Sequence, residues 1–364
     1  MSVAKIFLLI LILSLSSQHA LAVNIGLFGD IRLKATDIKD DPYGFELGDL
    51  DFYATQELSD NTRGFVELVF ENTSSGIVTD LERLWIMHTF NDEFKLSAGR
   101  FHTPLGRWNR TYHHGALVQD TVSRPFFLDF EDGATGVLPV HVVGVMSTGD
   151  IIRKNDEFNY EIAIGNGPSI DSSGGFSPVS KPEIDINVSS DTNKNKTLAA
   201  RVIYGHDDIP VKIGLFAMTH EISESAATGG LTNFRSTLID QTIFGTDLLF
   251  TQNKIEVLAE YYQFRNKSNI GTIGSYSASA WYVQFNYEIF NNFKFIAREE
   301  SLSFDKNNDS YFLILGTEQA KHHVLALRYD IDESNAIKFE LNAADNDFST
   351  DTTTFTVQWA FLIP

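Results

Sequence analysis

The feature that most constrains the fold of this chain is a strict alternation of apolar and polar residues, which recurs in many separate runs. A period of two places each set on its own face of a β-strand. The same pattern fills the runs 158–164, 325–330, 337–343 and 355–361, and no convincing helical stripe follows residue 22. In the run 281–289, one parity is apolar, and it comprises Trp281, Val283, Phe285, Tyr287 and Ile289. The chain is therefore predicted to be all-β.

Strand length and loop length favour a membrane barrel over a soluble sandwich. The alternating runs are about 9–12 residues long, which matches a tilted transmembrane strand better than a typical globular strand. Their polar faces carry charges, as a water-filled lumen requires. Short polar turns at 59–61, 91–93, 206–208, 291–292 and 332–335 alternate with longer loops rich in Gly, Ser, Asp and Asn. Turns at one end and long loops at the other are typical of outer-membrane barrels.

The number of strands follows from parity. Seventeen runs qualify as candidate strands, but a bacterial barrel with both chain ends on one side needs an even number. The run 311–316 is short and does not alternate, and it lies between two turns, 291–292 and 332–335, that are expected at the same end. We therefore assign this run to an outer loop and predict a transmembrane antiparallel β-barrel of sixteen strands.

The first 22 residues are typical of a secretory signal peptide. Lys5 supplies the positive start, residues 6–13 are apolar, and Ala20, Leu21 and Ala22 form a cleavage site with small residues at its two recognised positions. The predicted organisation is thus a signal peptide at 1–22 and one barrel at 23–364. Long outer loops are expected at 102–139 and 166–195, the first being the third outer loop.

Composition excludes several functions. The chain has 28 Lys and Arg against 48 Asp and Glu, a net charge of −20, and removal of Lys5 makes the mature charge −21. Nucleic-acid binding needs the opposite sign. There is no cysteine, so disulfides and Cys-ligated metals are excluded. No Gly-x-Ser-x-Gly, His-Glu-x-x-His or phosphate-binding glycine loop occurs, and we therefore do not expect an enzyme.

The third loop carries a resemblance to a known family. The segments 99–109 (GRFHTPLGRWN), 112–115 (YHHG), 123–125 (SRP) and 138–141 (LPVH), with the last strand 357–361 (VQWAF), resemble Gram-negative outer-membrane porin-like proteins related to phosphate-selective porins. The resemblance implies a sixteen-stranded outer-membrane porin whose third loop folds into the lumen and narrows it. It also implies outer-membrane lipid, the barrel-assembly machinery and a homotrimer as partners.

The chain departs from that family at two points. Outer-membrane barrels usually end in an aromatic residue that the assembly machinery recognises, whereas here Phe361 is followed by Leu362, Ile363 and Pro364. Phosphate-selective relatives line the pore with Arg and Lys, whereas this chain is strongly acidic. Phosphate selectivity is therefore not expected.

Charged residues of the third loop are candidates for the pore constriction. Charged rings at a constriction set ion preference. The same residues could instead pair with one another and hold the loop against the wall, and the two roles are compatible. The candidates are Arg100, Arg107, Arg110, Asp120, Arg124, Asp129, Glu131 and Asp132.

Other residues of this loop are candidates for anchoring it: His102, Pro104, Trp108, Asn109, His113 and His114. The histidine spacing matches no metal motif, so hydrogen bonding that fixes the loop is expected, with no metal and no cofactor. The aromatic residues Trp108, Tyr112, Phe126, Phe127 and Phe130 could guide sugars, but anchoring of the loop is the favoured interpretation.

The polar faces of the strands carry both signs of charge. This mixture should keep the lumen wet without making a selective filter. Leu341 is on the face of its strand that is predicted to meet lipid, and Glu340 is on the face toward the lumen. Leu341→Arg should therefore lower the free energy of unfolding by roughly 2–4 kcal/mol, and a charge swap at Glu340 should lower it much less.

The function predicted from these observations is passive, weakly selective diffusion of small hydrophilic solutes or ions through an outer-membrane porin. The charge of −21 suggests a mild preference for cations, because an acidic pore mouth concentrates them. The alternative is a non-conducting barrel that serves as an adhesin, a receptor or a structural envelope protein.

Overall fold

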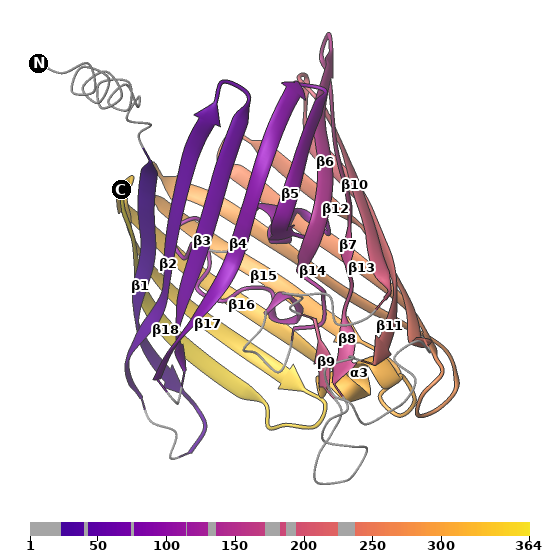
Figure 1. The fold of residues 1–364 in the computed structure, drawn as a ribbon. Helices are drawn as coiled ribbons and strands as arrows, with labels where there is room; N and C mark the ends of the chain where they lie inside the picture. Colours follow the sequence, from indigo (N-terminus) through magenta and orange to yellow (C-terminus); the bar gives the residue numbers. More distant parts are fainter. Residues whose placement is uncertain are drawn as a thin grey trace, which may run out of the picture.

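The computed structural model describes residues 23–39, 43–73, 76–113, 115–129, 136–171, 183–186, 194–224 and 237–364. The predicted signal peptide lies outside these residues. Within them the chain is a closed antiparallel β-barrel of sixteen long strands, as the alternation and the parity argument predicted (Figure 1). No helix in the described part of the chain is long and apolar enough to cross a membrane.

The barrel strands are long and follow one another around the ring. The first eight are β1 (Asn24–Thr36), β2 (Gly44–Ser59), β3 (Thr62–Thr73), β4 (Gly76–Asn91), β5 (Phe94–His102), β6 (His141–Arg153), β7 (Asp156–Asn166) and β10 (Lys196–His206). The remaining eight are β11 (Ile209–Glu224), β12 (Thr237–Gln252), β13 (Ile255–Ser268), β14 (Gly274–Phe290), β15 (Phe293–Ser303), β16 (Ala320–Asp332), β17 (Asn335–Asn346) and β18 (Thr352–Ile363).

Pairing of the first and last strands closes the barrel. The register runs from Leu27 opposite Ile363 to Thr36 opposite Thr354. Strand β18 therefore continues past Phe361 and includes Leu362 and Ile363. Pairing of β5 with β6 and of β7 with β10 bridges the two long loops. Two short strands, β8 (Ser169–Asp171) and β9 (Glu183–Asp185), pair within the second of these loops.

The two ends of the barrel differ. β1 begins and β18 ends at the end of the barrel that carries the short turns, and the longer connections leave from the other end (Figure 1). The run 311–316 is not a strand: it belongs to helix α3 (Ser310–Leu315), which Asp309 caps by accepting a hydrogen bond from the Tyr311 N–H. The assignment of this run to an outer loop is therefore confirmed.

The alternation separates an exposed outer face from a buried inner face. On β17, Leu341 is 43% exposed and Glu340 only 3%. The outward parity of β14 and β18 includes Val283, Phe285, Phe355 and Trp359, all of which are exposed. A closed barrel whose outer face is apolar requires a lipid surrounding, because water would meet a continuous hydrophobic belt.

One side of the barrel interior is apolar. Side chains such as Phe216, Tyr262 and Phe264 on β11 and β13 pack against Phe127 of the third loop and Phe312 of α3 in one buried cluster. The inner faces of these strands therefore carry apolar residues as well as charges. Sequence analysis predicted polar inner faces and missed this cluster. Alternation shows which residues of one strand share a face, but it does not show that inward-facing apolar residues of different strands meet one another.

Candidate pore constriction

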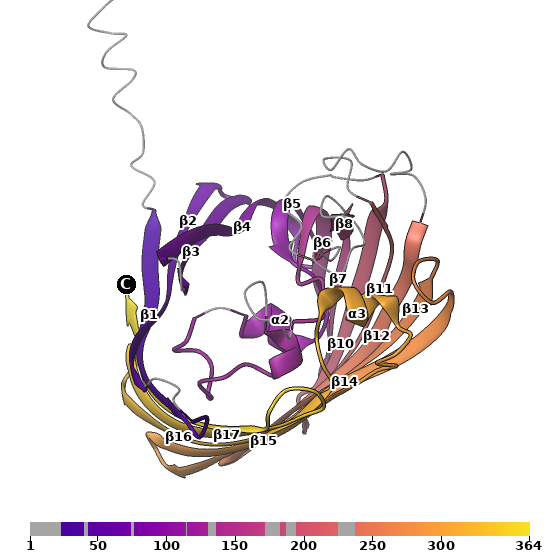
Figure 2. The same cartoon turned by 90° about the horizontal axis from the view of Figure 1, so that it is seen from below.

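The third loop runs from Thr103 to Val140 between β5 and β6. It contains helix α2 (Arg107–Thr111) and the single turn η1 (Phe126–Leu128). Seen along the barrel axis, α2 lies inside the ring of strands (Figure 2). Most of the described residues of the loop are buried, and their polar backbone groups therefore need partners inside the barrel.

Three carboxylates of the wall between β13 and β17 accept hydrogen bonds from the loop backbone. Glu260 of β13 accepts from the Trp108 N–H at 2.5 Å. Glu300 of β15 accepts from the Phe126 N–H at 2.5 Å. Glu340 of β17 accepts from the Val122 N–H at 2.7 Å and the Ser123 N–H at 3.0 Å. All three carboxylates are buried, so these charge-assisted hydrogen bonds are stronger than they would be in water.

Three cations of the wall donate to the loop carbonyls. Arg298 donates to Ser123 O and Arg124 O, each at 3.0 Å, and to Thr121 Oγ1 at 2.6 Å. Arg328 donates to Gln119 O at 2.7 Å. Lys338 donates to Ala116 O and Thr121 O. The wall from β13 to β17 thus presents both signs of charge to the backbone of one loop.

These contacts give the mixed charges of the wall a different role from the one predicted. The charged residues were expected to keep the lumen wet, but four of them are buried against the loop: Arg298, Lys338, Glu300 and Glu340. The expectation that a charge swap at Glu340 is cheap is therefore wrong in its physical basis. A lysine there would meet two N–H groups that now bind a carboxylate.

Gly106 shows how closely the loop approaches the wall. Its φ is +68°, which disfavours any residue with a Cβ. A Cβ would lie 2.1 Å from the Tyr262 hydroxyl and 2.2 Å from Glu260 Oε2. The glycine just before α2 therefore permits the contact between Trp108 and Glu260.

The structure places three of the predicted constriction residues in ion pairs with the wall. Arg110 contacts Glu161 of β7 at 2.7 Å. Asp120 contacts Lys294 at 3.0 Å and Arg328 at 3.5 Å. Arg100, at the end of β5, contacts Asp80 of β4 at 3.5 Å. These pairs join loop to wall or strand to strand, whereas sequence analysis considered pairing among the loop's own residues.

Two of the other predicted constriction residues lie beside an open part of the interior. Arg124 and Asp129 are half-buried and line a cavity described below. Arg107 is half-buried on α2 beside Tyr112, whose pKa is raised by burial and, to a smaller extent, by nearby carboxylates. Glu131, Asp132 and His114 fall outside the described residues.

The predicted anchoring residues that the structure describes lie near the points where the loop leaves and rejoins the wall. Asn109 donates to Thr103 O at 2.9 Å and Val140 O at 3.3 Å, and thus spans both arms of the loop. Pro104 and Trp108 are buried beside it. His102 and His113 are also buried, with ring centroids 4.0 Å apart.

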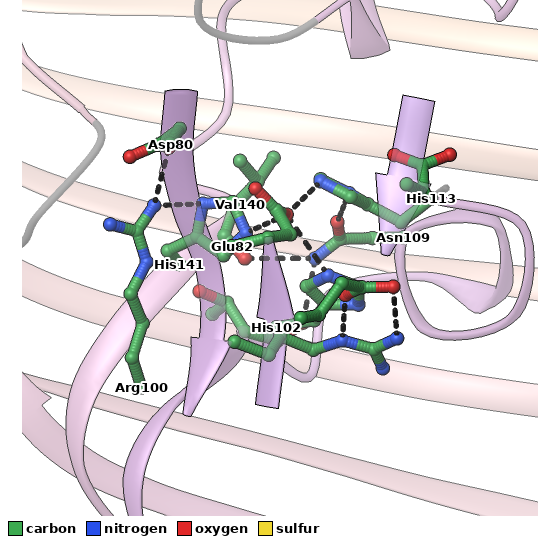
Figure 3. Close-up of polar contacts among 12 residues, drawn as sticks. Asp80, Glu82, Arg100, His102, Asn109, His113, Val140 and His141 are labelled. Carbon is green, nitrogen blue, oxygen red and sulfur yellow. Dashed lines mark hydrogen bonds and ion pairs between the residues drawn. The ribbon is translucent and has the colours of Figure 1, made fainter. Parts of the chain in front are cut away.

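Two further residues complete a buried cluster around these histidines (Figure 3). The nearest imidazole nitrogens of three histidines lie near one oxygen, Glu82 Oε1: His102 at 3.2 Å, His113 at 2.8 Å and His141 at 2.5 Å. The four side chains come from β4, β5, the loop and the start of β6, and all are at most 2% exposed. Sequence analysis did not consider Glu82 or His141 as site residues.

A β-bulge explains the direction of Glu82. In the pairing of β3 with β4, Glu67 is opposite Arg83 and Leu68 is opposite Leu81, so Glu82 is the extra residue. A bulge redirects a side chain and reverses the parity that follows it. The alternation by itself therefore gives no signal for Glu82.

The interior also holds a cavity of about 840 Å³ between the third loop and the β1–β3 and β16–β18 wall. Its described lining includes seven carboxylates and three basic side chains. The carboxylates are Asp30, Glu46, Asp49, Asp51, Glu71, Asp129 and Glu340, and the basic residues are Arg32, Lys34 and Arg124. The local excess of negative charge has the same sign as the charge of the whole chain.

Comparison with known proteins gives similarity in structure alone. No family model and no curated protein sequence matches the chain. The anion-selective porin from Comamonas acidovorans has a TM-score of 0.62 and 12% identity, covering 94% of this chain and 99% of that one. The trimer form of OmpT, an outer membrane protein of Vibrio cholerae, has a TM-score of 0.59 and 11% identity, covering 94% and 100%. The outer membrane channel DcaP of Acinetobacter baumannii has a TM-score of 0.58 and 11% identity, covering 95% and 99%.

These matches span nearly the whole of both chains and show that the fold is that of outer-membrane porins. They agree with the outer-membrane location that the sequence predicts. The narrower resemblance to the phosphate-selective group is not tested by them and stays a prediction.

Proposed function

We propose that this chain is an outer-membrane channel for passive, weakly selective diffusion of small hydrophilic solutes or ions, and that it is not an enzyme. The observation that carries the proposal is the polar cavity beside the third loop. In this reading the apolar cluster closes one side of the lumen, and solutes pass on the other side, between the loop and the β1–β3 wall. Porin-type neighbours support a channel of this general kind.

We infer a mild preference for cations from the lining of that cavity. Seven carboxylates against three basic residues give a negative local field. The preference stays weak because several charges are paired, as Asp30 and Arg32 are at 2.6 Å, and because physiological salt screens the rest over about 8 Å. Arg124 lines the same cavity, and its positive charge opposes the negative field of the carboxylates.

A reversal potential across a planar bilayer under a salt gradient tests this proposal. We expect modest cation selectivity and a shift toward anions in Asp49→Asn, with Glu299→Gln on the outer face as the control. Strong anion selectivity that disappears in Arg107→Ala or Arg124→Ala would overturn the cation assignment and restore a phosphate-type channel.

The alternative proposal is a non-conducting barrel that serves as an adhesin, receptor or structural envelope protein. The apolar cluster favours it, because Phe127, Tyr262 and Phe312 fill space that an open pore would leave to water. Correctly folded protein that shows no conductance at all would favour this alternative.

The partners follow from the same proposal. The exposed apolar belt faces lipid, and the barrel-assembly machinery inserts the chain. We propose a homotrimer, on the analogy of the trimeric OmpT form. Crosslinking in membranes tests the trimer: bands of two and three chains are expected, and a single-chain band alone would contradict it.

A further inference from the structure

The buried cluster of Glu82, His102, His113 and His141 has the geometry of a metal site (Figure 3). Tetrahedral Zn²⁺ holds nitrogen and oxygen ligands at about 2.0–2.2 Å, which places ligand atoms about 3.3 Å from one another. Glu82 Oε1 lies 3.2 Å from His102 Nε2 and 2.8 Å from His113 Nε2. Small side-chain shifts would therefore admit an ion among these three atoms.

Hydrogen bonding around His113 determines which of its nitrogens carries a proton. The Asn109 amino group donates to the carbonyls of Thr103 and Val140, so its Oδ1 faces His113 and can only accept. His113 Nδ1, 2.8 Å from this oxygen, must donate. In the neutral ring, Nε2 then holds a lone pair that points at the lone pairs of Glu82 Oε1. A positive charge between these two acceptors makes the contact favourable.

His141 is held in the opposite state. Its Nδ1 lies 3.2 Å from Arg100 Nη2, which can only donate. The proton of a neutral His141 is therefore on Nε2, which donates to Glu82 Oε1 at 2.5 Å. His141 thus positions the carboxylate, and its own nitrogen is not available to an ion while Arg100 stays in place.

We propose that Glu82, His102 and His113 bind a first-row divalent metal ion, with Zn²⁺ the best match, and that His141 and Asn109 are positioning residues for this site. Two imidazoles and one carboxylate suit Zn²⁺, whereas Mg²⁺ and Ca²⁺ prefer oxygen ligands alone. Ligating histidines commonly donate their second N–H to an oxygen, as His113 does to Asn109.

The ion would act as a structural link. Glu82 belongs to β4, His102 ends β5, and His113 follows α2, so one ion would join two wall strands to the base of the third loop. The proposed channel does not depend on this link for its chemistry. Metal binding and conductance can therefore fail independently of one another.

Metal titration of the full chain in detergent, after EDTA treatment and dialysis, tests the site. We expect one equivalent of Zn²⁺ per chain by elemental analysis. Co²⁺ should give the intense visible absorption of a four- or five-coordinate ion. Hydrogen exchange at residues 103–113 should slow when Zn²⁺ is added.

Variants assign the ligands. Glu82→Gln and His113→Gln should each weaken Zn²⁺ binding by more than 100-fold, and His141→Gln by roughly 10–100-fold while the one-to-one ratio is kept. His323→Gln is the matched control, because His323 contacts Glu299 at 2.6 Å in an exposed pair on the outer face, and its Zn²⁺ binding should equal that of the wild type.

Two outcomes would overturn the proposal. Folded wild-type protein that gives no Co²⁺ absorption and no Zn²⁺ retention would show that the cluster does not bind a metal ion. Binding that persists in His113→Gln, or that is lost in His323→Gln, would place the ion elsewhere. The wild-type Co²⁺ spectrum decides the question even if a variant fails to fold.

Discussion

Removal of the Glu340 carboxylate should release one arm of the third loop from the wall. The carboxylate is 3% exposed and binds the N–H groups of Val122 and Ser123. In Glu340→Ala both N–H groups lose a charged acceptor. Because Glu340 also lines the polar cavity, water can take over part of its role.

The expected free-energy cost follows from these two hydrogen bonds. A hydrogen bond to a charged group contributes about 1.5–3 kcal/mol, so two contribute about 3–6 kcal/mol. Water that enters the cavity can bind the two N–H groups and offset part of this loss, so the expected net cost is about 2–4 kcal/mol. That loss corresponds to a shift of roughly 30- to 1000-fold in the equilibrium between attached and released loop.

Hydrogen exchange followed by mass spectrometry measures this shift directly. Exchange at Val122 and Ser123 should accelerate by roughly the same factor, because exchange follows local opening. In planar bilayers, single-channel current should become larger and noisier as the arm moves. Glu299→Ala is the control, since that carboxylate is 47% exposed on the outer face of β15.

Unchanged exchange at residues 120–126 in a folded Glu340→Ala variant would refute the reasoning. It would show that the remaining wall contacts, among them those of Arg298, Lys338 and Glu300, are enough to hold the arm. Faster exchange over the whole barrel would also contradict it, because the predicted effect is confined to the loop.

Three further predictions concern other parts of the molecule. Leu341→Arg should lower the free energy of unfolding by roughly 2–4 kcal/mol in urea titrations of lipid-inserted protein, and a loss below 1 kcal/mol would mean that this position does not face lipid. Gly106→Ala should speed exchange at residues 106–112 without unfolding the barrel, because its Cβ would clash with Glu260 and Tyr262, and unaltered exchange there would contradict the close packing. Burial raises the pKa of Asp309 to about 6, so its ionised form is penalised in the fold. Protection of α3 should therefore fall as pH rises from about 4 through 6 and then level off, and Asp309→Asn, which keeps the helix cap, should remove this dependence.

Much of the candidate site could not be derived from the order of residues alone. His102, Asn109 and His113 stood out because they lie in one polar loop segment. Glu82 lies 20 residues before His102, on a strand whose bulge breaks the alternation, so its inward direction appears only once β3 and β4 are paired. His141 belongs to a segment that resembles the porin family, but its contact with Glu82 depends on the pairing of β5 with β6.

The role of the wall charges also depended on tertiary structure. The alternation along each strand places Glu300 and Glu340 on the inner face. It could not show that they meet backbone N–H groups, because their partners, Phe126 and Val122, lie 174 and 218 residues away in the chain. The path of a long loop through a lumen is fixed by the sum of such distant contacts.

The sequence by itself determined the barrel, its sixteen strands and the two faces of each strand, because side-chain direction in a strand is a local property with a period of two. Tertiary structure alone decided where the third loop lies, which charges are neutralised by it and which line the cavity, and that three histidines from separate elements meet at Glu82. Those features depend on strand register, a bulge and loop path, which no short stretch of sequence specifies.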